Sequence, residues 1–191
     1  ISVIAGNVAS GKSACRLAAH GADCIKIGIG PGSCCTTRRI VGFGVPQLHA
    51  IMDCAEKLKE RGFNNVKIIA DGGCRNSGDC VKALWGGADA VMAGYIFAGH
   101  DECPTFNGEK LYRGMSSRTV SGRSDVAPEG VCMRVNSKGT VVNTVLQYAA
   151  AIRAGCSMAN AMNLQELRNV RAVRVSTMSN EESDPVPAEY L

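Results

Sequence analysis

Short apolar runs alternate with amphipathic segments through the first half of the sequence, and each run ends at a glycine or an aspartate. Four runs have the length and apolar content of buried strands: residues 1–5, 24–28, 66–70 and 90–93. The segments between them that have helical character are residues 11–20, 46–61 and 79–85. Alternation of this kind predicts a parallel α/β sheet with helical crossovers. The pattern fits an open doubly wound sheet or half of an eight-stranded barrel, and periodicity alone does not distinguish the two.

The second half of the sequence is less regular. Residues 101–128 lack steady periodicity and are rich in glycine, serine and charge, so we expect a long loop or flap over a site. Residues 141–154 return to a helical pattern, and Asn163 with Glu166 predicts a capping box for a last short helix. Residues 171–177 alternate like a half-buried strand, and residues 179–191 are expected to be an acidic tail or an arm that reaches a neighbour. We interpret residues 1–191 as one domain.

Composition restricts the class of protein. The chain is 46% hydrophobic, and its formal net charge of +4 comes from 21 basic and 17 acidic residues spread along it. No basic block typical of a nucleic-acid tail is present, so we expect no nucleic-acid partner. The apolar stretches are too short for a signal peptide or a membrane span, so we expect the ten cysteines to be reduced thiols in an intracellular, cytosolic protein without a membrane partner. The chain opens in an apolar run without Met, and we expect a segment to precede it.

One motif favours a nucleotide hydrolase. Residues 6–13 read Gly-Asn-Val-Ala-Ser-Gly-Lys-Ser, which matches the phosphate-loop pattern between a predicted strand and a predicted helix. Asp71, at the end of another predicted strand, is then a candidate for the acid that positions magnesium. The alternative is an ordinary strand-to-helix loop that contains Gly, Lys and Ser by chance and binds no phosphate. A P-loop NTPase is therefore one hypothesis.

A second glycine-rich segment favours thiol chemistry. Residues 28–38 read Gly-Ile-Gly-Pro-Gly-Ser-Cys-Cys-Thr-Thr-Arg and follow a predicted strand. Such a loop turns sharply, exposes carbonyls and presents a thiol where parallel α/β folds place reactive groups. Arg38 and the loop amides are expected to favour the thiolate, the form that attacks. The alternative is that Cys34 and Cys35 are small buried residues.

Two further strand ends carry glycine. Asp71-Gly72-Gly73 and Gly94-Tyr95 each close a predicted strand. Glycines at these positions let a phosphate approach backbone N–H groups, and an aspartate accepts hydrogen bonds from ribose hydroxyls. In a barrel these strand ends converge on one face, which predicts a common nucleotide site.

Together these segments resemble the IMP dehydrogenase/GMP reductase family of (β/α)8 TIM barrels. The resemblance covers nearly the whole chain through residues 5–8, 28–38, 46–48, 69–74, 91–94, 114–117 and 129–130. Gly-Pro-Gly-Ser, Thr-Thr-Arg, Pro-Gln-Leu and Met-Ser-Ser, with residues 71–74 and 99–100, look like the reductase branch. The dehydrogenase branch usually carries an Arg-Tyr pair in its flap, and none follows Ser117. The resemblance implies that the chain covers the last four βα units, a flap at about 101–128 and a C-terminal segment, with the first half of the barrel outside it. Residues 117–129 are shorter than this family's flap.

The resemblance also implies residue roles. Cys35 would be the nucleophile, and Thr37 and Glu129 would handle protons of the ammonia leaving group. The residues that would hold the substrate are Ser33, Asp71, Gly72, Gly73, Gly94, Tyr95, Met115, Ser116, Ser117 and Gly130. Potassium would be bound by backbone carbonyls of Gly30, Gly32, Cys35 and Arg38. The cofactor NADPH would contact Gly30 and Met115.

The implied reaction belongs to purine nucleotide interconversion. Cys35 would add to C2 of GMP, ammonia would leave to give a covalent thioimidate, and hydride from NADPH would then release IMP. The family further implies a homotetramer. Oxidation of IMP to XMP with NAD, as in the dehydrogenase branch, is the main alternative. An NTPase and a non-enzymatic nucleotide-binding protein are the others.

Overall fold

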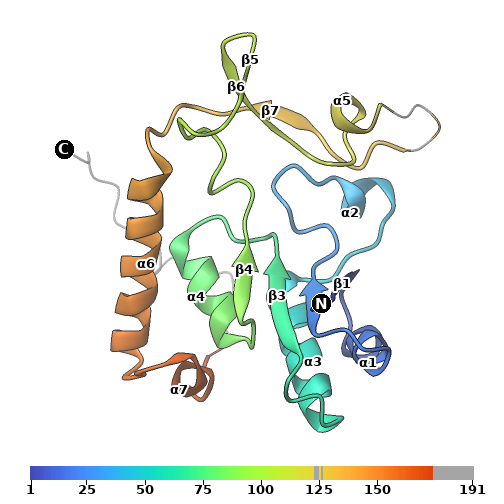
Figure 1. The fold of residues 1–191 in the computed structure, drawn as a ribbon, viewed down its shortest axis with the longest axis vertical. Coiled ribbons are helices and arrows are strands. Elements are labelled where there is room, and N and C mark those ends of the chain that lie inside the picture. Colours follow the sequence, from blue (N-terminus) through green and yellow to red (C-terminus); the bar gives the residue numbers. More distant parts are fainter. Residues whose placement is uncertain (123–124, 126, 174–191) are drawn as a thin grey trace.

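The computed structural model describes residues 1–122, 125 and 127–173, and its main element is a four-stranded parallel sheet (Figure 1). The strands follow one another in the order β1 Ile4–Val8, β2 Cys24–Ile27, β3 Lys67–Asp71 and β4 Ala90–Met92. Their spatial order equals their order in the sequence, as in the wall of a barrel, whereas a doubly wound sheet reverses direction at a switch point. The sheet is not closed, because β1 and β4 form its two edges. The predicted parallel sheet is confirmed.

Helices cover one face of this sheet. These are α1 Gly11–Ala19, α3 Gln47–Glu60 and α4 Ser77–Trp85, close to their predicted ranges. Ile25 and Ile27 of β2 are fully buried in one core with Ile51 and Cys54 of α3. The alternate residues of the strands point to the opposite face, where Lys26 is only half-buried. In a closed barrel this second face lines the interior.

The first strand-to-helix connection excludes the phosphate-loop interpretation. β1 continues through Val8, and Ser10 already caps α1 by accepting a hydrogen bond from Ser13 N. Gly6 and Asn7 therefore lie in a strand paired with β2. A phosphate loop needs the backbone N–H groups of such residues turned toward the ligand. The NTPase hypothesis is wrong because the segment is too short between its elements to surround a phosphate.

The segment predicted as a long loop contains regular structure. A hairpin is formed by β5 Thr105–Phe106 and β6 Glu109–Arg113, and β7 Cys132–Arg134 pairs with β6. Asn107 and Gly108 form its two-residue turn with φ of 50° and 78°. Asn-Gly between alternating residues is a strong hairpin signal, so the loop prediction is wrong for this part. A short helix, α5 Arg118–Ser121, lies between β6 and β7 in the sequence.

The C-terminal region carries two helices. α6 spans Val141–Met158 and is longer than predicted, and α7 spans Leu164–Arg168. The predicted N-cap is confirmed, because Asn163 Oδ1 accepts from Glu166 N at 3.0 Å, and the Glu166 carboxylate reaches back to Met162 N at 2.7 Å, one residue before the cap. Residues 171–173 form no strand, contrary to the prediction. Residues 174–177 and the expected tail at 179–191 lie outside the described residues.

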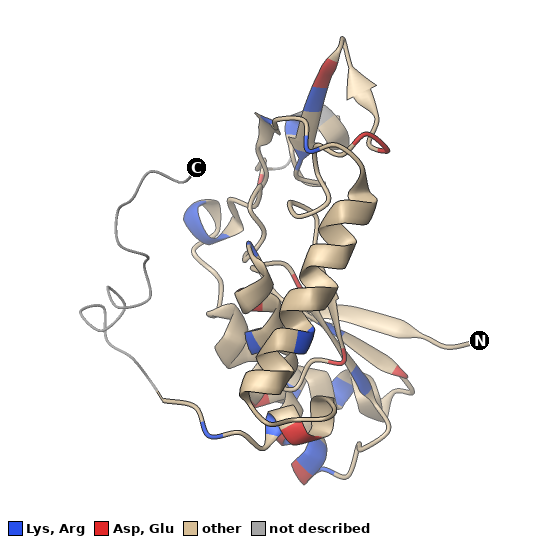
Figure 2. Cartoon of the chain, turned by 90° about the vertical axis from the view of Figure 1, so that its left-hand side faces the viewer, with Lys and Arg blue, Asp and Glu red and all other residues tan. Residues whose placement is uncertain are grey.

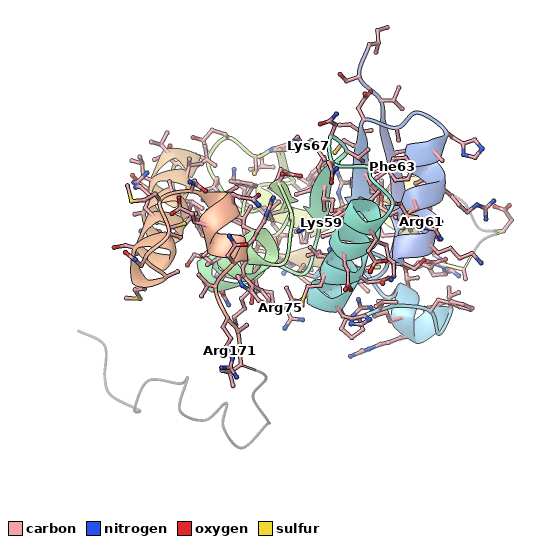
Figure 3. The ribbon with its side chains drawn as sticks, turned by 90° about the horizontal axis from the view of Figure 1, so that it is seen from below. Lys59, Arg61, Phe63, Lys67, Arg75 and Arg171 are labelled. Carbon is pink, nitrogen blue, oxygen red and sulfur yellow. The ribbon has the colours of Figure 1, made fainter. Side chains whose placement is uncertain are left out.

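Two aspartates accept hydrogen bonds from backbone N–H groups near the amino ends of the strands. Asp23 Oδ2 accepts from Val3 N at 2.7 Å, and Asp89 Oδ2 accepts from Ile68 N at 2.9 Å. Each aspartate follows Gly-Ala and directly precedes a strand, so the same Gly-Ala-Asp sequence makes the same kind of hydrogen bond in two βαβ units. Figure 3 shows this end of the molecule, where Lys59, Arg61 and Lys67 project. These basic side chains lie opposite the carboxyl ends of the strands.

Helix α6 presents an uncharged surface. Arg153 is its one charged residue, and Figure 2 shows the helix almost without charge colouring. Val145 and Leu146 on it are 48% and 60% exposed. Within the described part of the chain, no helix combines the length and apolarity needed to cross a membrane.

Candidate active site

The cysteine loop lies at the carboxyl edge of the sheet, between β2 and the short helix α2 Thr37–Ile40, which carries Thr37 and Arg38 and precedes α3 (Figure 1). Gly28 begins it with φ of 142°, and a Cβ there would lie 2.3 Å from the Asp71 carbonyl oxygen. Only glycine fits where the ends of β2 and β3 approach so closely. Gln47 Nε2 joins the same two strand ends by donating to the carbonyls of Ile27 at 2.8 Å and Asp71 at 3.3 Å. The Pro-Gln-Leu motif therefore fixes the base of the loop.

Cys35, Thr37 and Glu129 form a continuous contact chain. Cys35 Sγ lies 3.0 Å from Thr37 Oγ1, and Thr37 Oγ1 donates to Glu129 Oε2 at 2.7 Å. The backbone adds to this contact, because Thr36 N donates to the Glu129 carbonyl at 2.8 Å. A thiol, a hydroxyl and a carboxylate in line can pass a proton between the sulfur and the carboxylate. The three residues predicted to be catalytic are thus brought together.

The neighbouring cysteines have different surroundings. Cys34 is 2% exposed, and its thiol donates to the Tyr112 carbonyl at 3.5 Å. Burial raises the pKa of the Cys34 thiol, and the neighbouring Cys132 raises it further. Cys35 is only half-buried and contacts the hydroxyl of Thr37. A nucleophilic thiol needs access and a way to lose its proton, so the surroundings favour Cys35 over Cys34.

Gly114 of the flap and Gly130, just after it, pack directly on the cysteine loop. Gly130 forms a bridge with Cys35, and Val131 N donates to the Cys34 carbonyl at 2.9 Å. A Cβ on Gly114 would lie 2.9 Å from the Cys34 oxygen and 3.0 Å from Gly130 Cα. Any side chain at Gly114 would push the flap from the loop. The short backbone distances explain how Glu129 reaches Thr37.

The Asp71-Gly72-Gly73 segment packs against the cysteine loop. A Cβ on Gly72 would lie 3.2 Å from Gly32 N, and a Cβ on Gly73 would lie 3.1 Å from Pro31 Cβ. Asp71 Oδ2 forms an ion pair with Lys26 at 3.0 Å and accepts from Asn7 Nδ2 at 2.8 Å. Sequence reasoning assigned no role to Lys26 or to the Asn7 side chain. The one signal for Lys26 was its position between the apolar residues Ile25 and Ile27, because alternate residues of a strand point to opposite faces of the sheet.

The Gly94-Tyr95 strand end meets an aromatic side chain that we had not predicted. A Cβ on Gly94 would lie 2.3 Å from Tyr112 Oη, and the Tyr95 and Tyr112 rings pack edge to face at 6.0 Å. Burial raises the pKa of the Tyr112 hydroxyl, as do Cys34 and Asp71. Lys138 Nζ lies 4.7 Å from the centroid of the Tyr95 ring. Tyr112 therefore borders the strand end where we expect the phosphate.

The remaining predicted residues differ in exposure. Met115 is 81% exposed and Ser116 is exposed, whereas Ser117 is 2% exposed and its N–H donates to the Gly114 carbonyl at 2.9 Å. Ser33 is half-buried on the cysteine loop. Met115 and Ser116 thus lie open at the surface.

Arg38 braces the cysteine loop. Its guanidinium donates to the carbonyls of Ile29 and Val45 on the two sides of the loop. Gly30 packs on its stem, since a Cβ there would lie 2.7 Å from Arg38 Cγ. We had expected Arg38 to stabilise the Cys35 thiolate, but these contacts support the loop backbone. They hold in place the segment whose carbonyls are predicted to bind potassium.

Comparisons with known proteins identify the family. The family model described as IMP dehydrogenase / GMP reductase domain matches residues 1–186. The chain is 43% identical over 202 residues to inosine-5′-monophosphate dehydrogenase of Aquifex aeolicus, covering 96% of this chain and 41% of the relative. It is 42% identical over 191 residues to GMP reductase of Yersinia enterocolitica, covering 93% of this chain and 54% of the relative.

A solved structure agrees with the fold. The crystal structure of a cysteine-to-alanine variant of GMP reductase from Trypanosoma brucei, in complex with guanosine 5′-monophosphate, matches with a TM-score of 0.90 and 39% identity. The match covers 98% of this chain and 41% of that one. The chain thus spans about half or less of the length of these relatives, and its open sheet is part of a TIM-barrel-type α/β fold. It belongs to the IMP dehydrogenase/GMP reductase family of oxidoreductases.

Proposed function

We propose that this chain is the C-terminal half of the barrel domain of a GMP reductase, which converts GMP to IMP and ammonia with NADPH. The observation that carries the proposal is the contact chain from Cys35 Sγ through Thr37 Oγ1 to Glu129 Oε2, at 3.0 Å and 2.7 Å. Removal of an amino group needs both a nucleophile at the carbon and a proton for the leaving nitrogen. The Met-Ser-Ser motif and the absence of an Arg-Tyr pair after Ser117 in the sequence support the reductase branch.

The reaction assigns a step to each of the three residues. The Cys35 sulfur adds to C2 of the purine, and the C2–N bond breaks as the nitrogen takes a proton through Thr37 and Glu129. Ammonia leaves, and a thioimidate joins Cys35 to the purine. NADPH, when bound, supplies the hydride that reduces C2, and the carbon–sulfur bond then breaks to release IMP and the Cys35 thiolate.

Substrate placement follows from the surrounding strand ends. Asp71 would accept from ribose hydroxyls while Lys26 and Asn7 hold its carboxylate. Gly73 and Gly94 would bring backbone N–H groups to the phosphate, whereas the Gly72 N–H donates to the Met92 carbonyl at 3.0 Å and Gly72 would contribute by leaving space for the ligand. The remaining substrate contacts in the proposal are Ser33, Tyr95, Met115, Ser116, Ser117 and Gly130.

A monovalent cation fits the donors of the cysteine loop. Neutral carbonyl oxygens are suitable ligands for potassium, and Gly30, Gly32, Cys35 and Arg38 all contribute one from this loop. The Gly32 carbonyl accepts from Cys35 N at 3.0 Å, which leaves it a second lone pair. Such a cation would keep the Cys35 backbone in position. Gly30 and Met115 are proposed cofactor contacts, and a homotetramer is the proposed assembly.

IMP dehydrogenase is the second candidate. Relatives with that name are as similar to the chain as those named GMP reductase, at 43% and 42% identity. A dehydrogenase would use the same Cys35 addition, but hydride would leave C2 for NAD and water would then hydrolyse the adduct to XMP. The two reactions differ in which groups leave C2, and an assay with both substrates separates them.

The test uses the full-length protein. Purified enzyme is mixed with GMP and NADPH, and separately with IMP and NAD⁺, and reduced nicotinamide absorbance is followed. We expect GMP-dependent NADPH consumption that disappears in Cys35→Ser and persists in the matched control Cys34→Ser. NAD⁺ reduction with IMP, and none with GMP and NADPH, would assign the dehydrogenase reaction. Full activity in Cys35→Ser would contradict both.

A further inference from the structure

Lys138 places a positive charge next to the strand end where we expect the phosphate. Its Nζ donates to the carbonyls of Tyr95 at 3.0 Å and Ile96 at 3.4 Å, the two residues that follow Gly94. The same Nζ lies 4.7 Å from the centroid of the Tyr95 ring, within the range of a cation–π contact. Three interactions thus hold one ammonium group against a single short segment.

The backbone around Lys138 is fixed on the same segment. Lys138 N donates to the Gly99 carbonyl at 3.0 Å, and Asp101 N donates to the Gly139 carbonyl at 2.9 Å. A Cβ on Gly99 would lie 2.4 Å from the Asn136 carbonyl oxygen, so the two backbones are in direct contact. Lys138 is therefore anchored both at its backbone and at its amine, and the position of its charge is defined.

The charge of Lys138 has no acidic partner among residues 1–122, 125 and 127–173, where no ion pair includes it. Glu102, in the segment that packs on the Lys138 loop, instead accepts from Thr140 Oγ1 at 2.8 Å and from Val141 N at 3.0 Å. Backbone carbonyls are neutral, so they hold the ammonium without cancelling its charge. An ammonium has three N–H groups, and two are used. One N–H and a full positive charge remain for an anion.

The segment that Lys138 holds begins at the proposed phosphate site. Phe97 N and Ala98 N both donate to the Gly94 carbonyl, at 3.1 Å and 3.0 Å, so the chain turns sharply after Gly94. Tyr112 Oη lies on the other side of Gly94, 2.3 Å from the position of an added Cβ. Because Lys138 Nζ is bound one residue beyond Gly94 and consecutive Cα atoms are about 3.8 Å apart, its charge is within one screening length, roughly 10 Å at 0.1 M salt.

We propose that Lys138 is a specificity-determining residue whose fixed charge attracts the substrate phosphate to the Gly94 strand end and so favours nucleotides over nucleosides. The inference rests on the proposed function, which puts a nucleotide phosphate there. A phosphate monoester carries about two negative charges at neutral pH, so its attraction to one lysine is large compared with that of any neutral group of the ligand. Lys138 acts through this attraction and takes no part in the proton path of Cys35, Thr37 and Glu129.

The test compares GMP with guanosine, which lacks the phosphate. Dissociation constants for the full-length protein are measured by calorimetry for GMP and by ligand-observed NMR for guanosine. We expect Lys138→Met to weaken GMP binding by roughly tenfold and to leave guanosine binding within about twofold, because only GMP carries the charge that Lys138 attracts. Lys138→Arg keeps the charge and is expected to retain most of the GMP affinity.

A matched control removes a lysine far from the site. Lys59 lies at the opposite end of the sheet (Figure 3), so Lys59→Met makes the same change of net charge and is expected to leave both affinities unchanged. Salt supplies a second readout that a purely structural role would not produce. Lys138 is exposed, and the screening length falls from about 10 Å at 0.1 M to about 3 Å at 1 M salt. We expect the difference in GMP affinity between wild type and Lys138→Met to shrink over this range at constant potassium.

Several results would overturn the proposal. Equal losses for GMP and guanosine would mean that Lys138 only supports the turn, and unchanged GMP affinity in Lys138→Met would mean that its charge has no effect on the phosphate. If neither GMP nor IMP binds the wild-type protein, the proposed function fails. Inorganic phosphate then tests Lys138 without the purine: phosphorus NMR line broadening that is lost in Lys138→Met supports the proposal, and equal or absent broadening contradicts it.

Discussion

The Thr37 hydroxyl lies between the Cys35 sulfur, 3.0 Å away, and the Glu129 carboxylate, 2.7 Å away. Thr37 and Glu129 are 92 positions apart, so their contact depends on how the flap packs on the cysteine loop. A single hydroxyl thus links the candidate nucleophile to the nearby carboxylate.

Replacing Thr37 by Val removes this link at nearly constant volume. We expect kcat of the full-length enzyme to fall by roughly 100-fold or more, because proton transfer by a positioned group contributes about 10²–10⁴. Glu129→Gln is expected to lower kcat similarly, and the double variant to lose little more, since the two act in one path. Thr36→Val, beside Thr37, is the matched control. Independent, multiplicative losses in the double variant would argue against a shared path.

Gly94→Ala places a methyl group 2.3 Å from Tyr112 Oη and 3.0 Å from two of its ring carbons. We expect the full-length protein to lose about 1–3 kcal/mol in free energy of unfolding, the usual range for overpacking, and to bind nucleotide more weakly. Adding Tyr112→Phe removes the nearest atom and is expected to restore part of the loss. Tyr112→Phe alone, which adds no Cβ at Gly94, controls for the loss of the hydroxyl. Denaturant unfolding supplies the measurement, and equal stability of wild type and Gly94→Ala would refute the contact.

Asp89 joins three elements near the amino ends of the strands. Its carboxylate accepts from Ile68 N at 2.9 Å and pairs with Arg168 at 3.1 Å, so it connects β3, β4 and α7. We expect Asp89→Ala to lower the free energy of unfolding by about 1–2 kcal/mol, mainly through the half-buried Ile68 N–H. Asp23→Ala, whose partner Val3 N is exposed, should cost less. A larger loss for Asp23→Ala in thermal unfolding would contradict this order.

Glu102 makes stability depend on pH at the start of α6. Its own backbone N–H, the N–H of Val141 and the Thr140 hydroxyl lower the pKa of the Glu102 carboxyl below the ordinary 4.5. A carboxyl with a lowered folded-state pKa adds stability above its ordinary pKa and loses it as pH falls through the folded value. We therefore expect Glu102→Gln to be less stable than wild type at neutral pH, with the difference shrinking below pH 4.5. Unfolding midpoints at about pH 7 and pH 3.5 test this, and a difference that grows in acid would contradict it.

Much of the fold was predictable because its signals are local. Strand-length apolar runs and the 3.6-residue period located β2, β3, β4 and the main helices between the strands, and Asn163 with Glu166 predicted a cap that the structure confirms. The first apolar run, residues 1–5, placed β1 about three residues too early. The hairpin at Asn107 and Gly108 was also a local signal, and we overlooked it in a segment rich in glycine and charge. The phosphate-loop pattern shows the limit of such reasoning. Residues 6–13 match the pattern at every defined position, but β1 extends through Val8 and α1 is capped at Ser10, so no phosphate-binding loop forms between them.

The sequence by itself determined the order of strands and helices, the glycine-rich loops at the strand ends and the family resemblance, since each depends on residues near one another in the chain. Only the tertiary structure decided that Glu129 reaches Thr37, that Lys26 and Asn7 hold Asp71, and that Tyr112 lies against Gly94. Those contacts depend on strand register and on close backbone approaches, such as the 2.3 Å between an added Gly28 Cβ and the Asp71 carbonyl oxygen, which no local pattern encodes. Packing of distant segments therefore assembled the site from residues that the chain keeps apart.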